Sequence, residues 1–309
     1  MSQLTPEQVI ALLTLERALH SAELSSIDLA GLDLSRGDFT QAYLRKANLK
    51  NTTCRTSIFA EATLTMADLS GAVLEEARLS GASLIQANLN QANLRRADAQ
   101  KAKLYGACLD SIDAELANFS YADLQEVTAQ HAQFQRADLS SCKSNESNFS
   151  QVCFDGAKLH SSQWYGANLE GSSLVKANLE RSKFVKANLT GVDLTLADLI
   201  AANLSEATLT AAILDSADLL EATLARANLS GLTLRQTSFY SAELEAANFT
   251  GTTLAGVNLA QANLEHTIWD GATFDETTQV ADAVFTHAKG LTGEQKSWLR
   301  EQRALNVPS

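Results

Sequence analysis

The chain has 309 residues, with 24 Lys and Arg against 36 Asp and Glu, which gives a formal net charge of −12 at pH 7. This balance argues against a nucleic-acid backbone or an anionic membrane as the main partner. Hydrophobic residues make up 45 % of the chain, which excludes a disordered composition. No apolar run is long enough to cross a membrane, and the first basic residue, Arg17, comes too late for a signal peptide. We therefore expect a soluble, cytoplasmic protein.

Residues 1–21 carry the start signal of a helix. Thr5 suits the N-cap, Pro6 suits the first turn, and Gln8 stands at the capping-box position. We expect this helix to run to about His20. The apolar positions expected to face the residues that follow are Val9, Leu12, Leu15 and Leu19.

From residue 22 to about residue 276 the sequence repeats every five residues without insertion or deletion. The 51 central positions between Leu24 and Phe274 hold 34 Leu and 10 Phe, and the residue two places earlier is usually small. The repeat reads A-(D/N)-L-x-x, as in Ala197-Asp198-Leu199. A period of five fits neither a helix nor a strand. It indicates a short extended piece followed by a turn, with one large and one small side chain pointing inward.

Two patterns favour four repeats per turn of the chain. Glycines recur at multiples of four repeats in the second place after the central residue, where a corner with positive φ would favour them. Small central residues are followed four repeats later by aromatic ones, as close packing requires. The glycines are Gly31, Gly71, Gly171, Gly191, Gly231, Gly251 and Gly271, and the pairs are Ala99–Phe119, Ala114–Phe134, Ala129–Phe149 and Ser144–Trp164.

With these repeats the sequence resembles the pentapeptide-repeat proteins, whose motif is A(D/N)LXX, over more than four fifths of its length. The resemblance implies an all-β fold, namely a right-handed quadrilateral parallel β-helix, or solenoid, of about 13 coils with short α-helical caps at both ends. Long uninterrupted members of this family are typical of bacteria, and of cyanobacteria above all.

An open solenoid leaves unpaired backbone at both ends and therefore requires caps. We expect residues 1–21 to form the N-terminal cap. Residues 277–309 are expected to form an irregular segment and a second capping helix, because the repeat loses its register after Glu276. That helix should start at Thr292 and reach about Leu305. Its residues Trp298 and Leu299 would contact either the last coil or a second copy, which would make the protein a monomer or a dimer through its C-terminal end.

Residues suited to catalysis, cofactor binding or metal binding form no recognisable arrangement. The cysteines have no C-x-x-C spacing, and two of them occupy inward positions, which favours core packing. The histidines are scattered, and nothing resembles a phosphate loop or a nucleophile elbow. We therefore expect no cofactor, no metal and no enzymatic activity. The residues concerned are Cys54, Cys108, Cys142, Cys153, His20, His131, His160, His266 and His287.

Three residues of each repeat should face outward, and among them the tyrosines stand out. All five fall on two neighbouring faces, and tyrosine is enriched at protein interfaces. One alternative is that the tyrosines have no role. The other is that the contact surface is the flat glycine-marked face, which carries the seven recurring glycines named above. The candidate interaction residues are Tyr43, Tyr105, Tyr121, Tyr165, Tyr240, Lys103, Lys183 and Lys186.

The leading interpretation is a non-enzymatic scaffold that presents flat faces to a protein partner whose identity the sequence does not give. The resemblance also implies an alternative, because some family members mimic DNA and bind or inhibit DNA gyrase or another topoisomerase. Members that confer quinolone resistance usually carry loops within their repeats, and this chain has none, but the family also includes a gyrase-binding branch without loops. A gyrase supercoiling assay separates the two functions.

Overall fold

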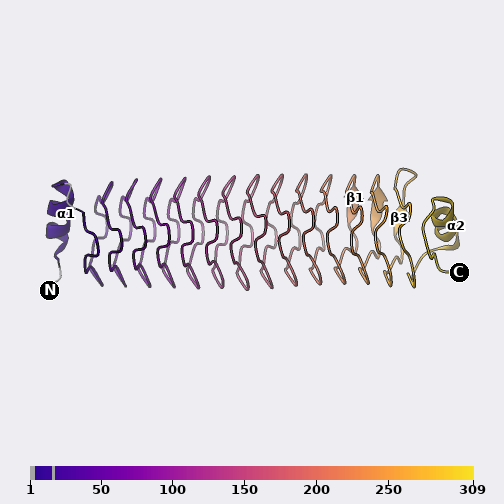
Figure 1. The fold of residues 1–309 in the computed structure, drawn as a ribbon, viewed down its shortest axis with the longest axis horizontal. Helices are drawn as coiled ribbons and strands as arrows, with labels where there is room; N and C mark the ends of the chain where they lie inside the picture. The colour runs from indigo at the N-terminus through magenta and orange to yellow at the C-terminus, as the bar shows by residue number, and fades with distance from the viewer. Residues whose placement is uncertain (1–3, 16–17) are drawn as a thin grey trace. The chain divides into compact units, whose positions relative to one another are not determined.

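The computed structural model describes residues 4–15 and 18–309. Its backbone contacts divide the chain into two compact units, Met1–Lys158 and Leu159–Ser309. In the described residues no helix has both the length and the apolar character needed to span a membrane. The elements are α1 (Pro6–Thr14) in the first unit and β1 (Thr233–Arg235), β2 (Thr253–Ala255), β3 (Thr273–Phe274) and α2 (Gly293–Glu301) in the second (Figure 1).

Parallel bridges between residues four repeats apart hold each unit together. In the first unit they begin with Glu23 opposite Tyr43, and in the second with Gln163 opposite Lys183. The bridging residue directly precedes the central residue of its repeat. The N–H of the central residue then donates a hydrogen bond to the next turn, and the Leu24 N–H lies 2.8 Å from the carbonyl oxygen of Tyr43. The predicted turn of four repeats is therefore confirmed.

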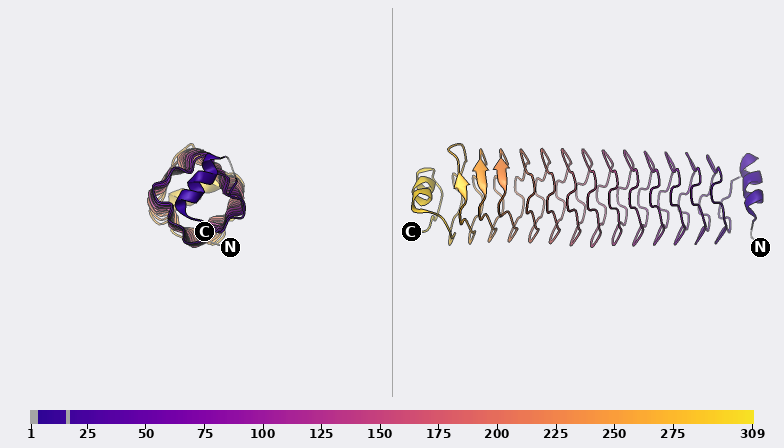
Figure 2. Two further views of the ribbon diagram at one scale, coloured as in Figure 1. Left: turned by 90° about the vertical axis from the view of Figure 1, so that its left-hand side faces the viewer. Right: turned by 180° about the vertical axis from the view of Figure 1, so that it is seen from behind.

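Continuous strands are few and short. β1, β2 and β3 form one parallel sheet (Figure 2). Thr233 lies opposite Thr253, and Thr253 lies opposite Thr273. Elsewhere in the described residues a repeat usually contributes a single bridging residue, because the chain turns directly after the central position. The fold is a succession of five-residue repeats, mostly non-helical, with a short helix near each end.

The corners lie at the second residue after each central position and adopt left-handed backbone conformations. Glycine is not required there, since Ser26 has φ of 59°, Arg36 of 62° and Gln41 of 58°, against 70° at Gly31. Corners in successive repeats are thus alike. The predicted positive φ at the glycines is confirmed, but their recurrence at multiples of four repeats does not mark a special corner.

The interior consists of stacked central side chains and the small residues beside them. Phe39 stacks on Phe59 with ring centroids 4.9 Å apart, and Phe249 stacks on Trp269 at 4.3 Å. The Trp269 indole N–H donates to Thr267 Oγ1 at 2.8 Å, so its polar atom is satisfied inside the core. Each fully buried large side chain contributes about 1.5–3 kcal/mol through loss of contact with water. These columns hold the outward side chains on a fixed backbone.

Helix α1 is shorter than expected and ends at Thr14 instead of about His20. Beyond the helix the backbone pairs with the first turns of the repeat, where the Leu19 N–H donates to the carbonyl oxygen of Asp38 at 2.7 Å. Val9 and Leu19 are buried as predicted, Leu12 is half-buried, and Leu15 is 66 % exposed at the helix end. The expected helix also included Glu16 and Arg17, which lie outside the described residues.

The repeat continues past Glu276, where the sequence analysis expected its register to end. One additional residue lengthens the spacing between paired positions, so that Asn258 bridges Gln279 and Asn263 bridges Val284. Helix α2 ends at Glu301 and not at about Leu305, because Leu305 pairs with Val284 in a further parallel bridge. The sequence signal for this continuation was the motif Ala283-Val284-Phe285, which lies one residue out of phase with the preceding repeats.

Candidate functional site

Most of the predicted tyrosines are exposed on the surface of their units. Tyr121 is 60 % exposed, Tyr43 51 %, Tyr165 44 % and Tyr105 38 %, whereas Tyr240 is half-buried. The lysines proposed beside them, Lys103, Lys183 and Lys186, are also exposed.

In the first unit, two neighbouring turns carry Lys103, Tyr105, Tyr121, Asp123 and Glu126, which we call the first tyrosine cluster. Lys103 bridges Asp123 through the backbone, and Tyr121 occupies a left-handed corner with φ of 60°. A hydrogen bond to the Glu126 carboxylate raises the pKa of the Tyr105 hydroxyl, with smaller contributions from burial and from the charges of Glu126 and Asp123. The hydroxyl therefore stays protonated as a donor. The cluster presents two aromatic rings with charges of both signs.

In the second unit, Tyr165, Lys183, Lys186 and Glu206 form the second tyrosine cluster. The Lys186 ammonium lies 5.8 Å from the centroid of the Tyr165 ring, within cation–π range. The same ammonium lies 3.8 Å from a carboxylate oxygen of Glu206. These contacts orient the tyrosine ring but leave it 44 % exposed.

Tyr240 belongs to a different feature that sequence reasoning missed. Ile200, Leu220 and Tyr240 follow one another at intervals of four repeats, and their backbones lie side by side, with the Glu221 N–H donating to the Tyr240 carbonyl oxygen at 3.0 Å. All three side chains are half-buried. The signal was an apolar or aromatic residue directly after the central Leu or Phe, as in Leu199-Ile200 and Phe239-Tyr240.

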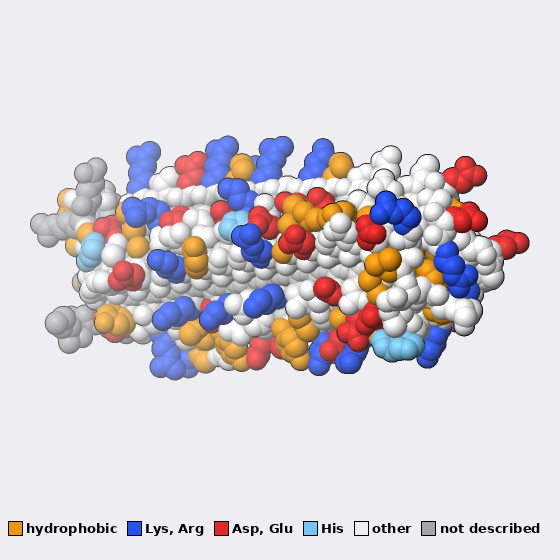
Figure 3. Space-filling view, turned by 45° about the vertical axis from the view of Figure 1, so that its right-hand side comes forward, with side chains coloured by type: hydrophobic (Ala, Val, Ile, Leu, Met, Phe, Trp, Pro, Cys, Tyr) orange, Lys and Arg blue, Asp and Glu red, His pale blue; other side chains and the backbone are white. Residues whose placement is uncertain are grey.

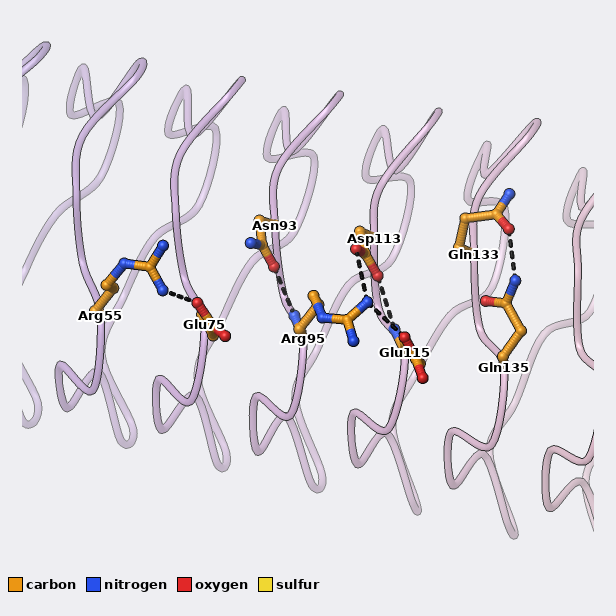
Figure 4. A network of polar contacts seen from close by, with 8 residues as sticks. All are labelled: Arg55, Glu75, Asn93, Arg95, Asp113, Glu115, Gln133 and Gln135. Atoms are coloured by element: carbon orange, nitrogen blue, oxygen red, sulfur yellow. Dashed lines mark hydrogen bonds and ion pairs between the residues drawn. The ribbon is translucent and has the colours of Figure 1, made fainter.

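A ladder of ion pairs in the first unit was also missed. Arg55 pairs with Glu75, and Arg95 pairs with both Asp113 at 3.2 Å and Glu115 at 2.5 Å (Figure 4). Exposed pairs of this kind contribute little to stability, typically about 0–1 kcal/mol. Their effect is to neutralise acidic side chains locally. The alternation of Arg and Glu at intervals of four repeats was the signal in the sequence.

At the C-terminal end of the second unit, α2 packs on the last turns of the repeat. Leu299 is fully buried, and the half-buried Trp298 stacks on Phe274 with ring centroids 5.6 Å apart. The Gln295 side-chain amide donates to the carbonyl oxygen of Ala272 at 2.7 Å. These contacts hold α2 on the repeat, and both capping by this helix and pairing of two chains through it remain predictions.

The cysteines show no arrangement for nucleophilic chemistry. Burial raises the pKa of the Cys54 and Cys142 thiols to about 12, so both stay protonated at neutral pH. Burial also raises the pKa of Cys153. Among the described residues, no group of three or more His, Cys, Asp or Glu side chains is placed to hold a metal ion.

The family model of pentapeptide repeats matches almost all of the repeating region. The matched ranges are 22–53, 38–76, 77–113, 117–160, 165–199, 202–240 and 242–278. A comparison with curated protein sequences gave no match.

Solved structures are also similar to this chain. HetL, a pentapeptide repeat protein involved in heterocyst differentiation regulation from the cyanobacterium Nostoc sp. strain PCC 7120, is 25 % identical over 87 % of this chain and 98 % of its own, with a TM-score of 0.32. Rfr23, a pentapeptide repeat protein from the cyanobacterium Cyanothece 51142, is 31 % identical over 34 % of this chain and 62 % of its own, with a TM-score of 0.13. A trypsin-treated variant of QnrB1, a plasmid-mediated fluoroquinolone resistance protein, is 18 % identical over 90 % of this chain and 97 % of its own, with a TM-score of 0.23.

Proposed function

Because the chain belongs to the pentapeptide repeat family, we propose that it is a non-enzymatic scaffold that presents flat faces to a protein partner. Members of this family are generally non-catalytic. The proposal includes the finer architecture, in which the four-repeat turns within each unit form a right-handed quadrilateral β-helix. The bridges between residues four repeats apart support it.

The observation that carries the proposal is the exposure of large aromatic side chains on a backbone fixed by its own hydrogen bonds. Tyr121 is 60 % exposed, yet its N–H donates to the carbonyl oxygen of Ser140 at 2.9 Å. A tyrosine held in this way contributes a large contact area while losing little conformational entropy on binding. We therefore assign partner binding to the first tyrosine cluster, where Tyr105 and Tyr121 are the expected energetic centre.

The test is capture of partner proteins from a lysate of the source organism by the wild-type chain and by a Tyr105→Ala/Tyr121→Ala variant. We expect the variant to lose the protein that the wild type captures, with an unchanged melting temperature. The matched control is His131→Ala, because His131 is also an exposed ring at a left-handed corner, with φ of 58°. It lies two repeats beyond Tyr121, on the opposite side of a four-repeat turn, and should retain capture.

Unchanged capture by the double variant would show that this cluster is not the contact surface. The second tyrosine cluster and the flat glycine-marked face would then be tested in the same way, with Tyr165→Ala as the first variant.

Mimicry of DNA toward a gyrase or another topoisomerase is the weaker proposal, because the surface charges are mixed. Lys and Arg side chains lie interspersed with Asp and Glu (Figure 3), and Arg55 and Arg95 pair with acidic residues of the first unit. A DNA mimic depends on unneutralised negative charge along a face. We expect no inhibition of gyrase supercoiling by micromolar protein, and inhibition would reverse the order of the two proposals.

A further inference from the structure

A cavity lies between β3 and the first turns of α2 in the second unit. Its volume is about 420 Å³, within the range of ligand pockets in proteins. It combines aromatic, polar and acidic side chains from the last regular turn and from the helix that covers it. The lining residues are Ala272, Thr273, Phe274, Asp275, Glu276, Thr292, Glu294, Gln295 and Trp298.

Two aromatic rings form the apolar part of this cavity. Phe274 and Trp298 stack at 5.6 Å with an angle of 29° between their planes, and both are half-buried. Behind them, the Trp269 ring lies 5.2 Å from Phe274 and is fully buried. The rings that line the cavity are therefore backed by the core and hold a fixed orientation.

The charged residues that line the cavity are all acidic. They are Asp275, Glu276 and Glu294, and none of them pairs with a Lys, Arg or His side chain in the part of the chain that the structure describes. The cations of α2 point elsewhere, since Lys296 donates to the backbone oxygen of Ser309 at 2.9 Å and Arg300 to that of Pro308 at 2.7 Å. The cavity thus keeps an unneutralised negative charge beside its aromatic rings.

Asp275 is fixed in place as an anion. Its Oδ1 accepts hydrogen bonds from the backbone N–H groups of Gly256 and Thr277, both at 3.1 Å. The bond from Gly256 is the main reason why the pKa of this carboxyl is lowered. Glu294 lies in the first turn of α2, where the helix dipole favours an acid. The dipole does not account for Glu276 or for the aromatic rings.

We propose that this cavity binds the guanidinium group of an arginine side chain in a basic segment of the partner protein. A guanidinium is planar, stacks on aromatic faces and pairs with carboxylates through two parallel hydrogen bonds. It is also more weakly hydrated than a lysine ammonium, so it loses less hydration free energy on entering an aromatic cavity. This assignment rests on the proposed scaffold function and places one contact of the partner at the C-terminal end.

The test titrates the full chain with a blocked Gly-Arg-Gly tripeptide while following the indole N–H resonance of Trp298 by NMR. Trp298 is the suitable reporter because Trp164 and Trp269 are fully buried. We expect a saturable shift with the arginine peptide, weaker binding of the lysine peptide, and no shift with the neutral citrulline peptide. An equal response to citrulline, or no response to arginine, would overturn the proposal.

A Glu276→Gln/Glu294→Gln variant should bind the arginine peptide about threefold to tenfold more weakly. The control Glu243→Gln/Glu245→Gln removes the same charge from exposed positions of the same unit that do not line the cavity. Equal weakening by both variants would show that only the net charge attracts the peptide, which would contradict a site. Because the titration contains no partner protein, its failure leaves the capture experiment above unaffected.

Discussion

The inward and outward residues of a single turn follow different rules. In the first unit, Leu124 is fully buried, whereas Tyr121, three residues earlier, is 60 % exposed. The leucine is confined by the turns on either side, so its size and polarity are fixed by packing. The tyrosine only has to tolerate a left-handed corner, which Gln, Lys, Arg and Ser also occupy elsewhere in the chain. We therefore expect outward side chains to be exchangeable with little change in stability.

The largest loss of stability is expected when a charged side chain replaces an inward residue. Leu189 is 2 % exposed, and a Leu189→Arg substitution would place an unpaired charge in the apolar column. We expect it to cost more than about 4 kcal/mol, visible as loss of the cooperative melting transition in circular dichroism. The matched control is Leu196→Arg, at a corner that is 51 % exposed, with an expected change within about 0.5 kcal/mol. Equal melting of the two variants would contradict the distinction.

A smaller difference is expected when an inward and an outward side chain of one turn are each truncated to alanine. Leu124→Ala should lower the free energy of unfolding by about 2–5 kcal/mol, because it leaves a cavity between stacked turns. Tyr121→Ala should change it by no more than about 0.5 kcal/mol, because most of that side chain is in water. Urea denaturation measures both values, and a loss at Tyr121 as large as that at Leu124 would argue against a surface role.

The two helices allow a smaller comparison, because both begin with the same capping box. Thr5 and Gln8 form it in α1, and Thr292 and Gln295 form it in α2. Gln295 also donates to Ala272, so Gln295→Ala should cost about 1–2 kcal/mol. Gln8→Ala should cost about 0.5–1 kcal/mol, because only the box is lost. Denaturation curves that order the two variants the other way would show that the bond to Ala272 does not hold α2 in place.

The smallest effect concerns pH. The pKa of Asp275 is lowered in the folded chain, mainly by the hydrogen bond from the Gly256 N–H, so its ionised form stabilises the fold above the ordinary pKa of an aspartate. This contribution is lost as the pH falls through the lower folded value. The melting temperature of Asp275→Asn should therefore be below that of the wild type at pH 7 and approach it in acid. A difference that does not change with pH would mean that the hydrogen bonds of Asp275 do not depend on its charge.

The inward part of the fold could be predicted from the sequence because its cause is local and repeated. A central Leu or Phe every five residues, with a small residue beside it, leaves few arrangements that bury both. The start of each helix was equally local, since Thr5 and Gln8 form the predicted capping box and Thr292 is the N-cap of α2.

Features that depend on contacts between distant residues were less predictable. The end of α1 at Thr14 follows from the pairing of Leu19 with Asp38 on another turn. The single residue added after β3 hides the continuing repeat from a strict five-residue count. It also places His266 and His287 face to face at 4.8 Å, although their separation in the sequence is not a whole number of repeats.

The candidate site was predictable only as a set of exposed residues. The positions of the tyrosines and of the neighbouring lysines followed from the repeat, but the contacts between their side chains did not. The contact of Lys186 with the Tyr165 ring, and that of Trp298 with Phe274, depend on side-chain conformations and on where α2 returns to the repeat. Neither contact corresponds to a periodic pattern in the sequence.

The most direct test of a binding surface at the first tyrosine cluster is photo-cross-linking from single positions. A benzophenone amino acid at position 121 should cross-link the captured partner, whereas the same group at position 131, on the opposite side of the turn, should not. Both positions are exposed left-handed corners, so the two proteins should have the melting temperature of the wild type. Cross-linking from position 131 but not from position 121 would contradict the account.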